Sequence, residues 1–285
     1  MKALLIALAV GVSALITVPH VSAQGCGRLR ERKEWRQLSG RERTAYISAV
    51  RSIHSGPKPT IYDSIVKIHL DQAPTTHTWP LFFPFHREYI RNFERELQKV
   101  DPSVILAYWD WSIDSQTPSN SPVWNDYGHS GGEGQCVLDG SFSGWQAQYN
   151  LNGTDLHCLR RAWNQGTSMG SVFPPEYLEQ NARDNDDYVT FWNTLERGPH
   201  GIVHAFIGGD MFDMASPNDP IFWLHHTFLD KLWAEWQQKN ANTRLAYGGN
   251  NADGSAVSLD DAIPGFNVSV RDVMDTRNSG YCYIY

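Results

Sequence analysis

Histidines at helical spacing constrain this chain more than any other feature. In the stretch 200–238, His200 and His204 are four residues apart, so on a helix they lie on one face. A Gly-Gly pair ends that helix, and a second helix then presents His225 and His226. Two imidazoles from one helix and one from the next form a half-site for a single metal ion.

A second group of histidines lies upstream, in residues 61–97. His69 and His86 lie on the apolar faces of two predicted helices, whereas His77 lies in a Pro- and Thr-rich connection and is predicted to be a loop ligand. Two groups of three imidazoles, with no carboxylate among the expected ligands, suit a pair of copper ions. A di-iron site would show Glu and Glu-x-x-His ligands instead.

Three segments resemble the copper motifs of a known family. The segment HTWPLFFPFHREYIRNFE, from His77, resembles the first copper motif of the type-3 copper polyphenol oxidases, the tyrosinases and catechol oxidases. The segments PHGIVHAFIGG, from Pro199, and SPNDPIFWLHHTFLDKLWAEWQ, from Ser216, resemble the second. The resemblance to short secreted fungal members extends to both ends. It implies a mainly α fold: an antiparallel four-helix bundle that holds a dinuclear copper site, with long irregular loops and a few short strands.

The resemblance also implies the ligands of the two copper ions. Copper A is expected on His69, His77 and His86, and copper B on His200, His204 and His226. The family pattern selects the second histidine of the His225-His226 pair, so His225 is expected to be a neighbouring donor. Phe82 and Phe222 each precede a ligand by four residues and are expected to pack over the copper pair. Asp230 is expected to accept a hydrogen bond from a ligand imidazole.

Other residues near the motifs have less specific interpretations. Asp219 either accepts a hydrogen bond from a ligand imidazole or caps the helix that begins near Pro220. Arg87 is expected to form a structural ion pair. The histidines outside the motifs are interpreted as structural or surface residues: His54, His129 and His157.

The implied activity is the oxidation of o-diphenols (catechols) to o-quinones, with O₂ as co-substrate. Tyrosinases that hydroxylate monophenols usually carry Asn after the first copper-B histidine, and here that position is Gly201. Glu196 matches an upstream Glu that, with this Asn, is thought to hold a water that takes the phenol proton. A phenol has a pKa near ~10, so a base matters more for monophenols than for catechols. We therefore expect weak or absent monophenol hydroxylation.

Three alternatives stay open beside a catechol oxidase. A full tyrosinase with monophenolase activity and an o-aminophenol oxidase differ in substrate scope only. An oxygen-binding, hemocyanin-like protein would use the same site, but hemocyanins are large assemblies with a domain that covers the pocket. A zinc hydrolase of the HExxH type would need Glu at Gly201.

Residues 1–23 have the pattern of a secretory signal, and 24–285 are expected to form a single tyrosinase-like catalytic domain in the secreted, extracellular protein. The end of the chain resembles the tyrosine motif that closes the family's catalytic domain, so an active enzyme is expected. Secretion favours two disulfides among four cysteines, and we favour Cys26–Cys282 and Cys136–Cys158. Asn152 and Asn267 are glycosylation acceptors if exposed.

The expected partners are small phenols: catechols, with monophenols or o-aminophenols as further candidates. A net charge of −7 without a long basic cluster argues against nucleic acid and anionic membranes. A monomer or weak homo-oligomer is expected.

In local structure, helices are predicted from Ser39 to about Ile53, after Thr60, after Pro84 and over 188–195, with a short strand at 105–111. Residues 112–185 are predicted to be irregular.

Overall fold

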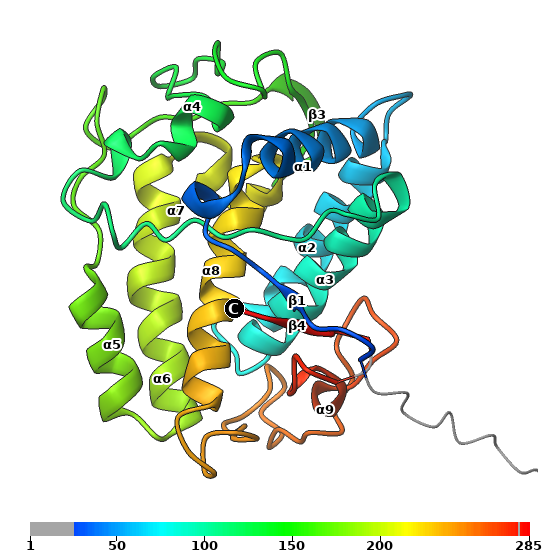
Figure 1. Ribbon diagram of the computed structural model, residues 1–285, viewed down its shortest axis with the longest axis vertical. Coiled ribbons are helices and arrows are strands. Elements are labelled where there is room, and N and C mark those ends of the chain that lie inside the picture. The colour runs from blue at the N-terminus through cyan, green and yellow to red at the C-terminus, as the bar shows by residue number, and fades with distance from the viewer. Residues whose placement is uncertain (1–25, 279) are drawn as a thin grey trace, which may run out of the picture.

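The computed structural model describes residues 26–278 and 280–285 and is mainly helical, as predicted (Figure 1). The predicted signal, 1–23, lies outside the described residues. The helices of seven or more residues are α1 (Gly40–Ile53), α2 (Ile61–Thr76), α3 (Phe82–Val100), α5 (Pro175–Asp184), α6 (Tyr188–Leu195), α7 (Gly201–Ile207) and α8 (Ile221–Gln237). Within the described residues, none of the helices is both long and apolar enough to span a bilayer.

The predicted helix starts are confirmed for α1 and α2. The Ser39 side chain accepts a hydrogen bond from the Glu42 amide, and Glu42 reaches back to the Ser39 amide. Thr60 and Asp63 form the same reciprocal box at the start of α2. The third start differs slightly, because α3 begins at Phe82 and takes Pro84 into its first turn. A proline fits there because the first turn has no intrahelical partner for its amide.

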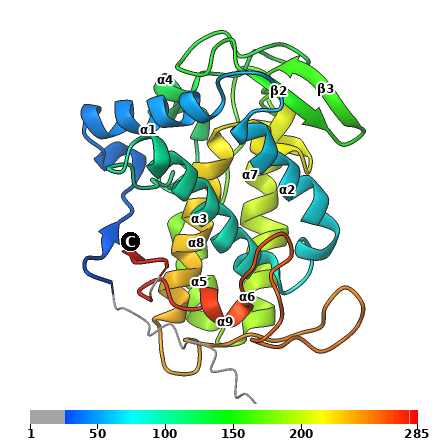
Figure 2. The same cartoon turned by 90° about the vertical axis from the view of Figure 1, so that its right-hand side faces the viewer.

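Helices α3 and α8 run side by side through the centre of the molecule (Figures 1 and 2). The rings of Phe93 and Trp223 stack between them, with centroids 3.8 Å apart and planes at 6°. On the other side of α8, α6 continues through a π-helical turn, Glu196–His200, into α7. Gly208, with φ of 63°, then ends α7, as the Gly-Gly pair predicted.

The expectation of irregular structure over 112–185 is only partly correct. That region contains α4 (Val123–Tyr127), α5 and an antiparallel hairpin of β2 (Gln146–Asn150) and β3 (Gly153–Cys158). The predicted disulfide Cys136–Cys158 is present and ties the loop before the hairpin to its second strand. Conversely, 105–111 forms no strand, since only Tyr108 makes an isolated bridge.

The two ends of the described chain lie together (Figure 1). Strand β1 (Arg30–Glu31) pairs in parallel with β4 (Tyr283–Ile284), and α9 (Val270–Val273) lies nearby. The predicted disulfide Cys26–Cys282 joins the same segments. Asn152, at the hairpin turn, and Asn267 are both exposed, so each is accessible to the glycosylation predicted for it.

The position of Asp230 contradicts our expectation that it would serve a ligand imidazole. Its Oδ1 accepts a hydrogen bond from Arg87 Nε at 2.5 Å, and Tyr283 and Tyr285 donate to its Oδ2 at 2.6 and 2.5 Å. Arg32 Nη1 lies 3.3 Å from the same oxygen. These five residues, all buried except the half-buried Tyr285, form a group that we call the tail cluster. The structural ion pair predicted for Arg87 is confirmed.

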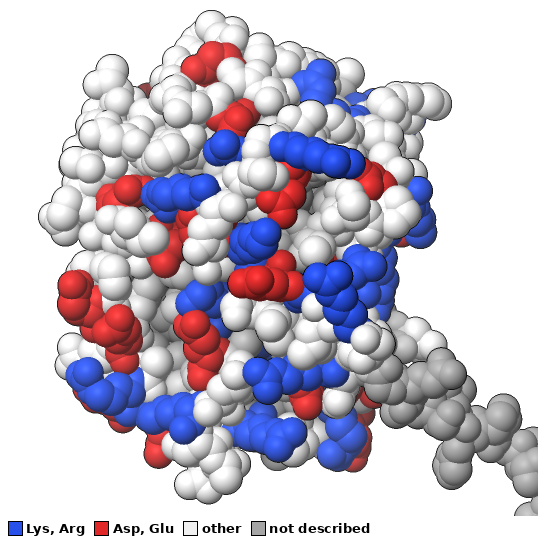
Figure 3. All heavy atoms as spheres, viewed as in Figure 1, with Lys and Arg blue, Asp and Glu red and all other residues white. Residues whose placement is uncertain are grey.

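Opposite charges alternate over the face that Figure 3 shows, with no patch of one sign. Lys33, which precedes α1, pairs with Glu42 in the first turn of α1 at 2.9 Å, and Lys231 pairs with Glu235 at 2.6 Å on α8. This face therefore offers no basic track of the kind that binds a phosphate backbone.

His54 makes the fold sensitive to acid. Its ring stacks on Trp145 with centroids 3.5 Å apart, and burial lowers its pKa to about 4, with Lys58 adding to the effect. Between the ordinary value near ~6.5 and about 4, only the unfolded chain binds this proton. Stability is therefore expected to fall as pH drops through this window. Urea unfolding should show a shallower pH dependence for His54→Gln than for wild type; parallel curves would contradict this.

Candidate metal centre

The histidines of the motifs converge from four helical segments in the middle of the molecule. Helix α2 carries His69 and ends at His77, which caps it in an extended conformation, as expected of a loop ligand. Helix α3 carries His86. The π-helical turn and α7 carry His200 and His204, and α8 carries the adjacent pair His225 and His226.

The structure separates these side chains into two groups. One ring nitrogen from each member of the first group, His69, His77 and His86, lies within 4.8 Å of the others. The second group contains His200, His204, His225 and His226 under the same criterion. The groups face each other, because the rings of His86 and His226 stack with centroids 4.3 Å apart. The arrangement has the two-site form predicted from the sequence.

Backbone carbonyls fix the tautomer of four imidazoles. Each of these carbonyl oxygens can only accept, so the facing Nδ1 carries the proton and Nε2 keeps a lone pair. The four Nδ1–O pairs are His69 with Met214 at 2.8 Å, His86 with Phe82 at 2.7 Å, His200 with Glu196 at 3.0 Å and His204 with Met211 at 2.7 Å. These carbonyl contacts were not predicted. Only those of Phe82 and Glu196 lie four residues before their histidine, a spacing that could be inferred from a helix in the sequence.

The Nε2 atoms of the ligand candidates converge within each group, where only a cation would make their close approach favourable. The Nε2 atoms of His69 and His86 are 3.3 Å apart, and both are unprotonated in the tautomers above. The Nε2 atoms of His204 and His226 are 3.2 Å apart, while Nε2 of His200 is buried without a protein partner. The His69 and His86 lone pairs, with no proton between them, fit a bound metal ion, and so do the converging Nε2 atoms of the second group; imidazole suits copper.

Burial keeps the imidazoles neutral. It lowers the pKa of His77 and of His204 to about 4, and it lowers the pKa of His69, His86 and His200 below the ordinary value. The neighbouring imidazoles add to this effect for His77 and for the latter three. Metal ligation requires the neutral form, so the site is ready to bind at neutral pH.

A tryptophan distinguishes the two adjacent histidines of α8. Trp111 Nε1–H donates to Nδ1 of His225 at 3.1 Å, so the proton of the neutral ring lies on Nε2. A protonated Nε2 cannot ligate a metal, which agrees with the expectation that His225 is not a ligand, although Nε2 has no acceptor among the described residues. His226 has no such donor on either nitrogen. Trp111 was not predicted, because it lies 114 residues from His225 in the sequence.

Two phenylalanines pack against both groups, as expected. The Phe82 ring lies 4.6 Å from that of His86 and 4.9 Å from that of His200. The Phe222 ring lies 5.2 Å from that of His69 and stacks on His226 at 4.0 Å. Both rings are fully buried and therefore exclude water from the space around the imidazoles.

Glu196 connects the segments that carry the two groups. Its Oε1 accepts a hydrogen bond from the Thr78 amide, and its Oε2 accepts one from Trp192 Nε1, both at 2.6 Å. Thr78 follows His77 directly and has a φ of 63°, which is uncommon for a residue with a branched side chain. Burial raises the pKa of Glu196 to about 7. The carboxylate thus fixes the backbone beside His77, a contact that the sequence did not reveal.

The remaining candidates lie outside the two groups. Asp219 precedes Pro220, the N-cap residue of α8; its side chain accepts from the Ile221 amide at 3.0 Å and pairs with Arg161, so it serves the start of this helix and no imidazole. The structural or surface roles expected of the other histidines are confirmed: His54 stacks on Trp145, His129 pairs with Asp139 and His157 pairs with Asp210.

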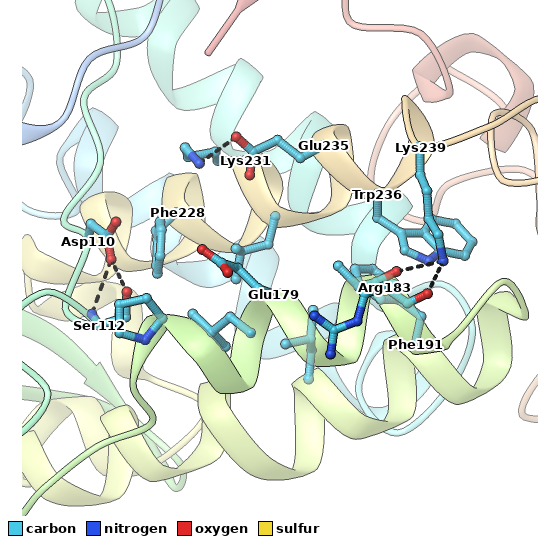
Figure 4. Close-up of a pocket in the computed structure, with 15 residues that line it drawn as sticks. Asp110, Ser112, Glu179, Arg183, Phe191, Phe228, Lys231, Glu235, Trp236 and Lys239 are labelled. Carbon is cyan, nitrogen blue, oxygen red and sulfur yellow. Dashed lines mark hydrogen bonds and ion pairs between the residues drawn. The ribbon is translucent and has the colours of Figure 1, made fainter.

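A separate hollow lies on the outside of the molecule, between α5 and α8 (Figure 4). Leu178, Phe191 and Trp236 contribute to its apolar floor, and its lining includes no histidine. Two lysines of its lining are neutralised locally, since Lys231 pairs with Glu235 and Lys239 with Asp186. This hollow is therefore distinct from the histidine groups.

Comparison with known proteins supports the same class. Residues 59–239 match the model of the common central domain of tyrosinase. The chain is 33% identical to the tyrosinase-like protein phomQ1 of Diaporthe leptostromiformis, over 92% of this chain and 79% of that protein. It is 34% identical to a tyrosinase of Streptomyces antibioticus, over 83% of this chain and 92% of that protein.

Solved structures show the same fold. A polyphenol oxidase of Thermothelomyces thermophila, in a glycine-to-asparagine variant, superposes with a TM-score of 0.76 at 23% identity, over 90% of this chain and 88% of that chain. A functional unit of octopus hemocyanin superposes with a TM-score of 0.58 at 19% identity, over 89% of this chain and 67% of that chain.

The helical fold and the paired histidine groups define a type-3 copper protein. With the match to the central domain over most of its length, the chain belongs to the tyrosinase family and is a copper oxidoreductase.

Proposed function

We propose that this protein is a catechol oxidase that converts o-diphenols to o-quinones with O₂ and hydroxylates monophenols weakly. In this proposal copper A binds to His69, His77 and His86, and copper B binds to His200, His204 and His226. The converging Nε2 atoms, 3.3 Å apart between His69 and His86 and 3.2 Å apart between His204 and His226, carry the proposal. When bound, the copper pair supplies the two-electron redox chemistry between the diphenol and O₂.

The chain's own residues hold and isolate this site. The carbonyls of Phe82, Met211, Met214 and Glu196 orient four imidazoles through Nδ1, as outer partners of a metal site do. The rings of Phe82 and Phe222 exclude water around both groups. A catechol brings two adjacent oxygens to the metal pair, so it needs less help from a protein base than a monophenol does.

Gly201 supports the preference for diphenols. It follows His200 at the start of α7 and has no side chain to hold a water or a phenol proton. The nearby carboxylate of Glu196 already accepts two hydrogen bonds, from Thr78 and Trp192. The position after His200 therefore supplies no side-chain amide, and both oxygens of the Glu196 carboxylate are already engaged.

Gly201→Asn is expected to raise the ratio of monophenol to diphenol turnover on the order of tenfold, below the 10²–10⁴-fold that a well-placed general base contributes. The change fits sterically, because a Cβ at Gly201 would meet only the Glu196 carbonyl oxygen at 3.5 Å. The measurement is quinone formation from a catechol and its matched monophenol by copper-loaded protein. Gly201→Ala is the control, since it adds the Cβ without the amide.

The wild-type assay separates the proposal from its alternatives. Turnover of the catechol alone supports a catechol oxidase, whereas comparable turnover of both substrates would make this a tyrosinase that does not need Asn at this position. An o-aminophenol tested in parallel would reveal the third activity. Reversible O₂ binding without turnover of any phenol would favour an oxygen carrier.

A further inference from the structure

One loop contacts both histidine groups. Residues 208–216, which we call the carbonyl loop, connect α7 to the turn before α8. Within it, the Met211 carbonyl accepts the Nδ1–H of His204 at 2.7 Å, and the Met214 carbonyl accepts that of His69 at 2.8 Å. A displacement of this single loop would therefore rotate one imidazole in each group.

Asp210 attaches the carbonyl loop to the hairpin side of the molecule. Its Oδ1 lies 2.7 Å from Nε2 of His157 on β3, and its Oδ2 accepts the Arg160 amide at 2.8 Å. The Asp210 amide in turn donates to the Arg160 carbonyl at 2.9 Å. The side chains of His157 and Asp210 are only 6% and 10% exposed, so solvent competes little with these contacts.

The partner of Asp210 is itself fixed. Nδ1 of His157 faces the Asp155 carbonyl at 2.6 Å, so both ring nitrogens of His157 face acceptors. The hydrogen bond to Asp210 is the main reason that the pKa of His157 is raised. The next residue, Cys158, is joined to Cys136, which anchors this end of β3.

The start of the loop packs directly on the segment that follows β3. A Cβ at Gly208 would lie 2.3 Å from the Ala162 carbonyl oxygen, and one at Gly209 would lie 2.2 Å from that of Arg160. The Ala162 amide also donates to the Ile207 carbonyl at 3.0 Å. These contacts fix the carbonyl loop relative to the segment after β3, and the Asp210 side chain adds two further contacts between them.

We propose that Asp210 is a positioning residue for the dinuclear site: through its contacts with His157 and Arg160 it holds the carbonyl loop, and thereby the Nε2 atoms of His69 and His204. Asp210 touches neither imidazole and acts through the Met211 and Met214 carbonyls. The inference rests on the ligand set of the proposed function, and it predicts that one substitution weakens both copper sites together.

The test is the affinity of the folded protein for Cu(I) alone, measured at equilibrium against a chromophoric chelator, together with the number of copper ions per chain. Asp210→Ala is expected to weaken binding at both sites by about 10-fold, the lower end of the 10–100-fold range for residues that contact a metal ligand directly, because Asp210 acts one contact further out. Asp210→Asn keeps an acceptor for the Arg160 amide and is expected to recover part of that loss. Asp139→Ala, which removes the carboxylate beside the exposed His129, is the matched control with wild-type affinity.

Wild-type affinity at both sites in folded Asp210→Ala would overturn the inference, and so would an equal loss in Asp139→Ala. If Asp210→Ala does not fold, His157→Ala removes the contact with Asp210 from the β3 side and keeps the contact of Asp210 with the Arg160 amide. It is therefore expected to show a smaller loss at both sites, and wild-type affinity would again overturn the inference. A wild-type chain that binds fewer than two copper ions would instead overturn the proposed ligand set.

Discussion

Asp230→Ala is expected to lower the free energy of unfolding by about 3–5 kcal/mol, the usual cost of removing one partner of a buried ion pair. The substitution leaves Arg87 and Arg32 buried without their shared carboxylate. It also removes the acceptor of the Tyr283 and Tyr285 hydroxyls. Burial alone would raise the pKa of Asp230, but the two arginines hold it below its ordinary value, so the native structure contains the charged form.

Urea unfolding of the wild type and the variant, at equal copper content, measures this effect, since a bound metal would itself shift the transition. Lys67→Ala is the control, because Lys67 and Asp71 form an exposed pair with both side chains 49% exposed. Such a pair contributes about 0.3–0.5 kcal/mol. A change in Asp230→Ala no larger than in this control would contradict the role that we assign to the tail cluster.

The sequence predicted the part of the site that is built from local geometry. Helical spacing placed His200 and His204 on one face of a helix, and the Pro- and Thr-rich context of His77 indicated a residue just beyond a helix end. Phe82 and Phe222 lie one helical turn before a histidine, so their packing follows from the same period. These relations span a few residues and can be derived without tertiary structure.

The errors arise where the partner comes from a distant segment. Asp230 lies one turn after His226, which suggested a contact with the imidazole. Its actual partners are Arg87, 143 residues away, and Tyr285, 55 residues away. The donor to His225 is Trp111, 114 residues away. No local period specifies such pairs, so only the folded structure identifies them.

The missed secondary structure has a related cause. Helix α5 is short and mostly polar and buries only Leu178 and Asn181, so a periodicity argument has few apolar positions to use. The β2–β3 hairpin exposes most residues of β3 and turns through Leu151 and Asn152. Both elements cover the outside of the central helices and owe their stability to that packing.

His204→Ala is expected to reduce the copper content from two ions per chain to one and to abolish diphenol oxidation. The substitution removes the Nε2 that faces His226 at 3.2 Å and leaves the first group, His69, His77 and His86, intact. Oxidation of a catechol by two electrons needs both metal ions. The loss of turnover should therefore exceed the 10–100-fold that follows from losing an outer partner of a metal ligand.

Metal analysis and catechol turnover on the same samples test this prediction, with His129→Ala as the control, because His129 is exposed and its ion-pair partner is Asp139.

The adjacent pair on α8 provides a finer comparison. His226→Ala is expected to lose copper as His204→Ala does, whereas His225→Ala should keep both ions, since Trp111 directs the proton of His225 to Nε2. Two copper ions and full turnover in His204→Ala would show that the second group does not bind metal as proposed. Copper loss in His225→Ala, with retention in His226→Ala, would reverse the assignment of the ligand within this pair.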